Sequence, residues 1–432
     1  MVSMHLPPHL TIKDQHLKIA GCDTVELAFK YGTPLYVTDE DRIRQNFQGY
    51  KKALTARYPH IRVLYAAKAN GNPAILKILA QEGAGADVFS SGELKIALQA
   101  GMKPEFLLFN GSSKTEEDHR LAVESGVRVS LDSIDELLQL DRIAGELGKV
   151  VEISFRVNPA MEVPTHPKIA TGLATSKFGI PATEIEAAYA KALACAHVVP
   201  VGIHCHIGSQ ILSVEPFAKE AQVLMEVVAD LHKMGVKFKF VDLGGGLGVG
   251  YEHTADPAPG FEAYADAVMP EITATFSRLG ISPEIWIEPG RSMVCDSTVL
   301  LTKVNSVKKA HKTFVNVDAG FNTLIRPAMY DSYHEVVVAD RAGDAPTATY
   351  TITGPICETG DILAHDRSLP EVQAGDLIAL LDAGAYGYAM ASQYNGRGRC
   401  AEVLVKGEKA SLMRRAETLE DLLAAVVTPP WL

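Results

Sequence analysis

Short apolar runs alternate with amphipathic stretches between about residue 40 and residue 290. Hydrophobic positions two apart predict strands, and hydrophobic positions three and four apart predict helices. The predicted strands include Ile61–Ala67, Val150–Asn158, Val201–Ile207, Phe238–Leu243 and Glu284–Glu288. The predicted helices between them include Asn72–Gln81, Gly92–Ala100, Ile134–Leu147 and Val214–Met234. Strand–helix alternation over about 250 residues indicates a parallel sheet and favours a (β/α)8 barrel, with a doubly wound sheet as the other arrangement.

The pattern changes after about residue 295, where strand-like segments follow one another with few helices between them. The predicted strands are Val299–Val307, Thr313–Asp318, Ala348–Thr353, Leu377–Leu381 and Ala401–Val405, and a helix is predicted at Leu419–Val426. Two strand-like runs near the start, Leu17–Ala20 and Pro34–Thr38, are expected to join this part. The sequence therefore predicts a barrel over residues 40–292 and a mostly β domain from residues 1–39 plus 293–432.

Composition narrows the class of protein. A length of 432 residues suits two substantial domains. The formal net charge of −11 argues against nucleic acid or an anionic membrane as a partner. No apolar run reaches about 18 residues, so no membrane helix is expected, and no signal peptide is visible near the start. Six scattered cysteines form no C-x-x-C pair, which favours reduced thiols in a cytoplasmic protein over a disulfide framework or a zinc site.

The first candidate for chemistry is Lys68, within Ile61–Asn70. Strand alternation places Leu64, Ala66 and Lys68 on one side of the strand. A lysine at the end of an apolar barrel strand is desolvated and can act as an amine nucleophile that forms a Schiff base. A lysine whose charge simply reaches solvent from the strand end is the other interpretation.

The second candidate is the pair His204 and His206, which lie two apart on a predicted strand and face the same way. A metal pair is conceivable, but no third ligand stands at a supporting spacing, so no metal site is predicted. His206 is followed by a Gly–Ser turn, which suits a ring stacked on a planar cofactor with Ser209 reaching an anion. A hydrogen-bonded core histidine is equally compatible with this pattern.

Three consecutive glycines, Gly244, Gly245 and Gly246, follow an apolar strand. Their backbone N–H groups can approach a phosphate closely, although a tight turn would also use glycine. The run is not the dinucleotide-binding fingerprint, because reading it from Gly244 puts Val249 at the last glycine position. No Lys-Ser/Thr follows, so it is not a P-loop either.

Glu288 ends the apolar strand that begins near Ile285, where an acid is costly to bury without a cationic partner. The ring nitrogen of pyridoxal phosphate is such a partner, because an acid keeps it protonated and the ring then accepts electrons. Arg291 stands three residues later and can bind a phosphate or a carboxylate. A salt bridge between Glu288 and Arg291 is the alternative.

Three segments of the predicted β domain carry further polar groups. Arg326 and Tyr330 form a donor pair suited to a carboxylate, Cys357 and Glu358 place a thiol beside an acid, and Tyr386 lies between glycines. An exposed polar loop explains any one of these segments taken alone.

Taken together, these segments resemble the alanine-racemase-like (fold type III) pyridoxal-phosphate decarboxylases, and within them the diaminopimelate decarboxylase family. The likeness covers nearly the whole chain, from GTPLYV at residues 32–37 to the terminal PPWL. It rests on many strings in family order: YAAKAN, ADVFSSGEL, FNG, FRVNP, THPKIATG, SKFG, HCHIGSQ, LGGGLG, EPGR, RPAMYDSYH, CETGD and DAGAYGYAMASQYNGRGR.

The resemblance implies pyridoxal 5'-phosphate as cofactor and a role for each matching residue. Lys68 would bind the cofactor covalently, Asp87 would orient it, His206 would stack on the ring and Glu288 would pair with the ring nitrogen. The positions that match the family's phosphate site are Ser209, Gly245, Gly246, the Glu288–Arg291 turn with Gly290 and Arg291, and Tyr386. Arg156 and Lys177 match positions near the cofactor or in buried ion pairs.

The resemblance also implies a substrate and a partner. The substrate-binding set would be Arg291, Arg326, Tyr330, Glu358 and Tyr386, with the Cys357 thiol near the substrate α-carbon. The implied reaction is decarboxylation of meso-2,6-diaminopimelate to L-lysine and CO2, the last step of lysine biosynthesis. Another amino acid with a distal carboxylate is the alternative substrate. The family's homodimers share their active sites, so Cys357 and Glu358 are expected to act in the other subunit's site.

Two other classes are disfavoured by particular residues. Alanine-racemase-like enzymes pair the ring nitrogen with an arginine and lack CETGD, whereas this sequence has Glu288 and CETGD. A regulatory homologue without activity would be expected to lose the lysine, the thiol or the phosphate contacts, and all of these residues are present.

Overall fold

The computed structural model describes residues 6–255 and 257–432. The chain forms two compact units. The β unit consists of Met1–Ile43, Gly250–Pro257 and Val294–Leu432, and the barrel unit consists of Arg44–Val249 and Ala258–Met293. Residues 1–5, which the sequence assigns to the β domain, lie outside the described residues.

Eight parallel strands close into a barrel in the barrel unit. In chain order they are β5 (Ile61–Ala66), β6 (Gly85–Val88), β7 (Leu107–Phe109), β8 (Arg128–Leu131), β9 (Val151–Asn158), β11 (Val198–Cys205), β12 (Phe240–Asp242) and β13 (Glu284–Ile287). The pairing of β13 with β5 closes the sheet, with Ile285 opposite Ile61. Closure confirms the predicted (β/α)8 barrel and excludes the doubly wound sheet. A short strand, β10 (Ile180–Pro181), adds to β9.

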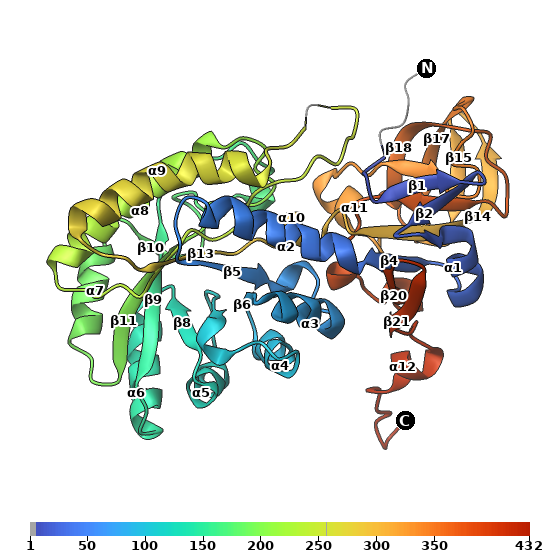
Figure 1. Ribbon diagram of the computed structural model, residues 1–432. Helices are drawn as coiled ribbons and strands as arrows, with labels where there is room; N and C mark the ends of the chain where they lie inside the picture. The colour runs from blue at the N-terminus through green and yellow to red at the C-terminus, as the bar shows by residue number, and fades with distance from the viewer. Residues whose placement is uncertain (1–5, 256) are drawn as a thin grey trace. The chain divides into compact units, whose positions relative to one another are not determined.

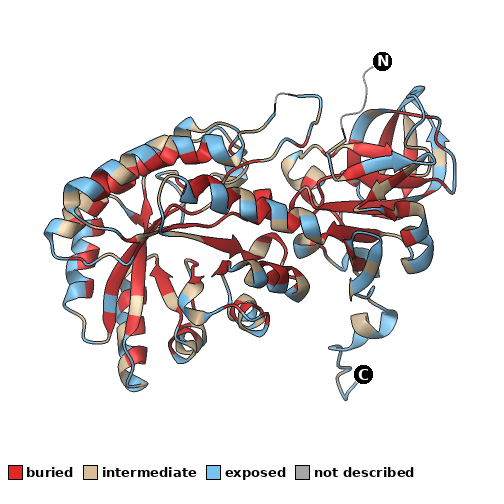
Figure 2. Ribbon diagram, viewed as in Figure 1, coloured by how far each residue is buried: buried red, intermediate tan, exposed pale blue. Residues whose placement is uncertain are grey.

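Helices connect the barrel strands and lie outside them (Figure 1). They are α3 (Pro73–Glu82), α4 (Ser91–Gln99), α5 (Glu116–Ser125), α6 (Ile134–Glu146), α7 (Ile185–Leu193), α8 (Glu215–Lys233) and α9 (Phe261–Leu279). Helix α2 (Glu40–Thr55) leads toward β5, and the short α10 (Arg291–Val294) follows β13. Figure 2 shows that the strands are buried while the longer helices keep an exposed face, as the amphipathic patterns predict.

Local sequence explains where several helices begin and end. The side chain of Asn72 accepts a hydrogen bond from the backbone N–H of Ala74, and Pro73 occupies the first turn of α3. Thr115 and Asp118 form a reciprocal capping box at the start of α5. Gly83 ends α3 in the left-handed conformation, which glycine adopts without steric cost.

The inside of the barrel is packed with large apolar side chains. Phe240 stacks on Trp286 with ring centroids 4.0 Å apart. Leu64, Leu108 and Val201 complete this cluster, and all five residues are almost fully buried. This end of the barrel is therefore a filled core, so polar chemistry is confined to the other end of the strands.

The β unit is built on one large sheet in the order β18–β17–β15–β14–β4–β20–β21, with β19 paired to β14 and β16 paired to β19. The bounds are β4 (Leu35–Asp39), β14 (Thr298–Lys309), β15 (Thr313–Val317), β16 (Val336–Val338), β17 (Ala348–Thr353), β18 (Ile362–Leu369), β19 (Leu377–Leu380), β20 (Ala401–Lys406) and β21 (Lys409–Arg414). A small sheet of β1 (Leu10–Lys13), β2 (His16–Ile19) and β3 (Cys22–Asp23) accompanies it, with α1 (Thr24–Tyr31), α11 (Arg326–Tyr330) and α12 (Leu419–Leu423). The mostly β character predicted from the sequence is confirmed.

Most predicted elements lie within a few residues of the observed ones, and three differences concern their ends. Lys68 lies in a short 3-10 helix, Ala67–Ala69, instead of on the strand itself. Strand β11 ends at Cys205, so His206 lies beyond it. The C-terminal helix ends at Leu423, earlier than predicted. Within residues 6–255 and 257–432, no helix combines the length and apolar content needed to cross a bilayer.

Candidate active site

Polar side chains gather where the barrel strands end. Lys68 follows β5, Asp87 lies in β6, Asn110 follows β7, Asp242 ends β12 and Glu288 follows β13. All the strands are parallel, so their carboxyl ends meet at one rim, where enzymes of this fold carry their catalytic groups. Five positions scattered over more than half of the chain are thus brought to one place.

Lys68 and Asp87 form an ion pair at this rim. The Lys68 Nζ atom also lies 4.3 Å from the ring centroid of Phe89. Asp87 is fully buried. Burial and the charge of Glu288 raise the pKa of the Asp87 carboxyl, and the neighbouring Lys68 ammonium opposes that rise. The lysine amine is therefore held in one position by an acid that has no access to solvent.

Glu288 is buried, with 5% of its surface exposed, and both of its oxygens have neighbours. Oε1 accepts a hydrogen bond of 2.7 Å from Nδ2 of Asn110. Oε2 lies 3.3 Å from Nε2 of His204. Burial alone would raise the pKa of Glu288, but His204 and Lys68 outweigh burial and hold the pKa well below its usual range. The Glu288 side chain is therefore a buried carboxylate.

Asp242 lies beside Glu288 and behaves in the opposite way. Burial and the adjacent charge of Glu288 raise the pKa of the Asp242 carboxyl well above its usual range. Ligand atoms of His204, Asp242 and Glu288 all lie within 4.8 Å of one another, a grouping that could hold a metal ion. The sequence showed no third ligand beside the histidines because Asp242 and Glu288 come from neighbouring strands. Two buried carboxyls with pKa values pushed apart are typical of a functional site.

His206 is joined to the glycine turn. Its Nδ1 accepts a hydrogen bond of 3.1 Å from the backbone N–H of Gly245. Burial, together with the positive charges of Arg156 and Lys68, lowers the pKa of His206 well below its usual range. Arg156 is itself buried, and its Nη2 donates to the backbone carbonyl of His206 at 3.2 Å. The His206 ring is therefore neutral and fixed in orientation.

The predicted phosphate residues of the barrel unit share one end of the barrel, whereas Tyr386 belongs to the β unit. Nη2 of Arg291 donates a 3.0 Å hydrogen bond to Oγ of Ser209. A Cβ atom on Gly245 would lie 2.2 Å from the carbonyl oxygen of Glu288, and a Cβ on Gly246 would lie 2.6 Å from that of Gly208. Only glycine permits this approach of three loops. Gly290 is buried in the turn between Glu288 and Arg291.

The remaining predicted residues belong to the β unit. Arg326 is buried, and its Nη1 lies 2.9 Å from Nε2 of His334. Nδ1 of His334 donates a 2.8 Å hydrogen bond to the carbonyl oxygen of Leu381, so Nε2 is the acceptor for Arg326. Tyr330 ends the same short helix, α11. The Arg326 guanidinium is thus anchored on the neutral His334 ring.

Cys357 and Glu358 lie in an exposed loop of the β unit. Sγ of Cys357 is 3.3 Å from Nδ2 of Asn395, and Glu358 accepts a 2.7 Å hydrogen bond from the Tyr394 hydroxyl. Tyr386 has φ of +58°, a left-handed conformation that bulky residues seldom adopt and that is common at functional sites. Lys177 of the barrel unit is exposed.

Sequence reasoning named no role for Asn110 and Asp242, and it left His204 among open alternatives. Asn110 is the polar residue of the FNG string directly after β7, and Asp242 directly precedes the glycine run. A polar residue at the end of an apolar barrel strand is the signal that could have identified both.

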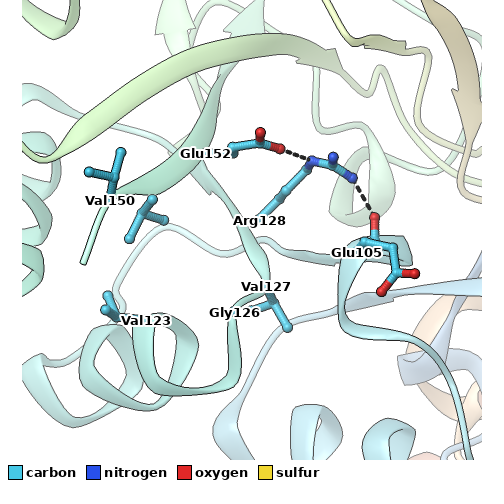
Figure 3. Close-up of a pocket in the computed structure, with 8 residues that line it drawn as sticks. Glu105, Val123, Gly126, Val127, Arg128, Val150 and Glu152 are labelled. Atoms are coloured by element: carbon cyan, nitrogen blue, oxygen red, sulfur yellow. Dashed lines mark hydrogen bonds and ion pairs between the residues drawn. The ribbon is translucent and has the colours of Figure 1, made fainter.

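A separate pocket of about 270 Å³ lies at the opposite end of the strands, near the starts of β8 and β9 (Figure 3). Arg128 crosses it, donating from Nε to Glu152 at 2.8 Å and from Nη1 to the carbonyl oxygen of Glu105. Val123, Val150 and neighbouring apolar residues form its other wall. The guanidinium is already satisfied by these acceptors, so the pocket contributes nothing to the chemistry at the other rim.

Comparison with known proteins identifies the family. Residues 40–295 match the family described as pyridoxal-dependent decarboxylase, pyridoxal binding domain. A diaminopimelate decarboxylase of Archaeoglobus fulgidus is 51% identical over 97% of this chain and 99% of its own length. One from Pseudomonas aeruginosa is 44% identical over 95% and 97%.

A solved structure agrees with these sequences. The crystal structure of the M. jannaschii diaminopimelate decarboxylase in complex with L-lysine superposes with a TM-score of 0.92 and 38% identity, covering 98% of this chain and 99% of that one. The present chain therefore belongs to the pyridoxal-dependent decarboxylases, in the branch that contains the diaminopimelate decarboxylases.

Proposed function

We propose that this protein decarboxylates meso-2,6-diaminopimelate to L-lysine and CO2, with pyridoxal 5'-phosphate as cofactor. The observation that carries the proposal is the buried, ionised Glu288 at the barrel rim that also holds Lys68 and Asp87. Identity of 51% over nearly the full length to a diaminopimelate decarboxylase supports the choice of substrate.

The residues at the rim fit the cofactor in charge and in shape. Lys68 offers an amine for the aldehyde, and the Glu288 carboxylate suits a protonated ring nitrogen. Arg291 and Ser209, hydrogen-bonded to each other, offer donors for a phosphate. The glycine turn brings backbone N–H groups close to the same loops. A neutral His206 ring can lie against a cationic ring without repulsion.

When bound, pyridoxal phosphate supplies an electron sink that stabilises the negative charge left on the α-carbon as CO2 departs. The protein's residues prepare this step. Asp87 orients the Lys68 amine, Glu288 holds a proton on the ring nitrogen, and His206 covers the ring. We assign the return of a proton to the α-carbon to the Cys357 thiol or to a water that it positions.

Substrate selection is assigned to the distal end of the molecule. Diaminopimelate presents an ammonium and a carboxylate there, whereas ornithine and lysine present an ammonium alone. Arg326 with Tyr330 suits the distal carboxylate, and Glu358 suits the ammonium, with Arg291 and Tyr386 completing the set. A guanidinium facing a bare ammonium would be repulsive, which disfavours ornithine. The anchoring of Arg326 by His334 supports this assignment, because it fixes the donor's direction.

We also propose a homodimer in which Cys357 and Glu358 serve the partner's site. Their exposure in a loop supports this role, because the loop is available to a second copy. The six cysteines are all free, which supports the cytoplasmic location expected from the sequence.

The test is to supply the purified protein with pyridoxal phosphate and meso-diaminopimelate and to measure lysine and CO2. Equal amounts of both products are expected, and ornithine should give none. Lys68→Ala should abolish turnover and the visible absorbance of the covalently bound cofactor, while Lys233→Ala, which changes an exposed lysine of the same unit, should retain both. Absence of product with cofactor bound would refute diaminopimelate as substrate and direct the search to other amino acids with a distal carboxylate.

A further inference from the structure

Each oxygen of the Glu288 carboxylate contacts a residue that has no assigned role. Asn110 donates to Oε1 at 2.7 Å, and His204 faces Oε2 at 3.3 Å. Asn110 and His204 are each 1% exposed. An ionised carboxylate accepts about four hydrogen bonds, so both contacts leave lone pairs for a further N–H group.

The proton positions on His204 follow from its two neighbours. Nδ1 lies 3.1 Å from the hydroxyl oxygen of Ser130, and Nε2 points to the Glu288 carboxylate. A carboxylate only accepts hydrogen bonds, so Nε2 must carry a hydrogen, since two facing lone pairs would repel. Ser130 can then donate its hydroxyl proton to Nδ1. Ser130 is itself held, because Lys114 donates to its backbone carbonyl at 2.9 Å.

Asn110 connects Glu288 to the lysine. The same Nδ2 atom donates to Oδ1 of Asp87 at 2.7 Å and to Oε1 of Glu288 at 2.7 Å, using the two hydrogens of one amide. Asp87 in turn pairs with Lys68 through its other oxygen. A continuous chain of polar contacts therefore runs from Ser130 through His204, Glu288, Asn110 and Asp87 to the amine that binds the cofactor.

We propose that His204 is a positioning residue for the cofactor's ring nitrogen: its Nε2, 3.3 Å from Oε2 of Glu288, holds the Glu288 carboxylate in one orientation. Asn110 holds the other oxygen of Glu288 by a hydrogen bond and links Glu288, through Asp87, to Lys68. This inference rests on the proposed use of Glu288 toward pyridoxal phosphate. It assigns to His204 a function distinct from that of His206, two residues later.

The charges around Glu288 explain why such a residue is needed. Asp242 from β12 and Asp87 from β6 face Glu288 as acids, while Lys68 after β5 and His206 after β11 face it from the other elements. Three neighbouring carboxyl groups favour protonation of one of them, and a protonated Glu288 could not hold a proton on the ring nitrogen. Burial and the charge of Glu288 raise the pKa of Asp242, whereas the neighbouring His204 and Lys68 lower the pKa of Glu288, so Asp242 is the carboxyl group that favours the proton.

The same three groups could ligate a metal ion, but that arrangement would occupy the Glu288 carboxylate, which would then not be available to the cofactor's ring nitrogen. A positioning role needs no added ion and uses every contact that the side chains already make. We therefore interpret His204, Asp242 and Glu288 as a group that binds a cationic ring and not a metal ion.

Two amide substitutions of His204 distinguish a positioning role from a packing role. In His204→Gln the longer amide nitrogen can take the place of Nε2 and reach Glu288, whereas in His204→Asn the shorter amide reaches only Ser130. Both variants keep a polar group of similar size in the same buried site. The dissociation constant for pyridoxal phosphate is measured by titrating each apoprotein and following protein fluorescence. The pH dependence of the bound cofactor's visible absorbance is recorded in parallel.

We expect His204→Asn to weaken binding by at least about tenfold, because the contact between Nε2 and the charged Glu288 oxygen is lost, and to shift the absorbance–pH curve. His204→Gln should stay within about threefold of the wild type with an unshifted curve. In a Glu288→Gln background, His204→Asn should cause no further loss, because its effect passes through the carboxylate.

Equal behaviour of the Asn and Gln variants, or an equal loss with and without Glu288, would overturn the inference and leave His204 a packing residue. His204→Leu provides a third comparison, with the same expectation as Asn for binding and absorbance. Failure of the wild type to bind pyridoxal phosphate would instead refute the proposed function, so the two failures are distinguishable.

Discussion

Gly245→Ala adds one carbon at the point where three loops of the barrel rim meet. The new Cβ would lie 2.2 Å from the carbonyl oxygen and 2.9 Å from the carbonyl carbon of Glu288. Both obstacles are backbone atoms, which cannot move aside by rotating a side chain. The backbone N–H of Glu288 is also held by the carbonyl of Gly244 at 2.7 Å, so the two loops move together.

The size of the effect follows from these distances. A Cβ needs at least 3.0 Å from other heavy atoms, so the turn must open by about 1 Å. Overpacking of this kind typically costs about 1–3 kcal/mol of folding free energy. Opening the turn also displaces Glu288 and weakens the hydrogen bond from Gly245 to His206, and a misplacement of about 1 Å can lower a rate by about 100-fold.

The matched control is Gly92→Ala, the same substitution in helix α4 of the same unit. There the new Cβ meets only the Ser90 hydroxyl oxygen at 3.6 Å, an ordinary contact. Replacing a helical glycine by alanine should raise stability by about 0.5–1 kcal/mol. The two variants are therefore expected to change the free energy of unfolding in opposite directions.

The assay combines thermal unfolding of the apoprotein with titration by pyridoxal phosphate. Gly245→Ala should lower the unfolding midpoint and weaken cofactor binding by at least about tenfold, whereas Gly92→Ala should leave binding unchanged. Wild-type affinity and midpoint in Gly245→Ala would refute the reasoning, because the turn would then be free to open without moving Glu288.

Three further predictions concern burial, a buried ion pair and subunit exchange. Burial raises the pKa of the Glu220 carboxyl to about 8, so the stability present below its unfolded pKa of about 4.5 is lost as pH rises to about 8. At about 1.36 kcal/mol per unit, Glu220→Gln should remove a decline of roughly 3–4 kcal/mol between pH near 5 and pH near 8, measured by unfolding at both; an unchanged slope would contradict the prediction. Lys114 and Glu136 form a buried pair at 2.9 Å, so Lys114→Met should cost about 3–5 kcal/mol in chemical unfolding, and Lys114→Met with Glu136→Leu should recover most of it. Inactive Lys68→Ala and Cys357→Ala proteins, dissociated and mixed, should regain about a quarter of wild-type activity, since half of the random dimers carry one intact site; no recovery would refute shared sites.

The hydrophobic pattern of the sequence predicted most helices and strands, because the secondary structure of a segment depends largely on residues close together in the chain. The alternation of Ile61–Ala66 and the 3.6-residue period of Ile134–Glu146 follow from which side faces the core, and neighbouring residues alone decide it. Repeated strand–helix units restrict the topology to parallel sheets. The ends of the strands and helices were less well predicted. Lys68 lies in a short helix after the strand, because the chain must turn at the rim.

Single residues with an unusual position in the pattern were also visible in the sequence. Lys68 and Glu288 each end an apolar run, and three glycines follow another. Their roles came from a resemblance that covers the chain, since a strand-end lysine or acid by itself has an ordinary structural explanation. The binding roles of these residues remain predictions that the proposed experiments test.

Sequence by itself determined the elements, the barrel-like alternation and the residues able to do chemistry. Only the tertiary structure decided whether the sheet closes, and closure brings Ile285 beside Ile61. It also decided that Asn110 meets Glu288, 178 positions away, and that Asp242 and His204 flank the same carboxylate. The physical reason is that strand register and closure set which side chains share the rim, and proximity in a buried rim then sets their ionisation. Neither contact nor charge state is a property of any segment alone.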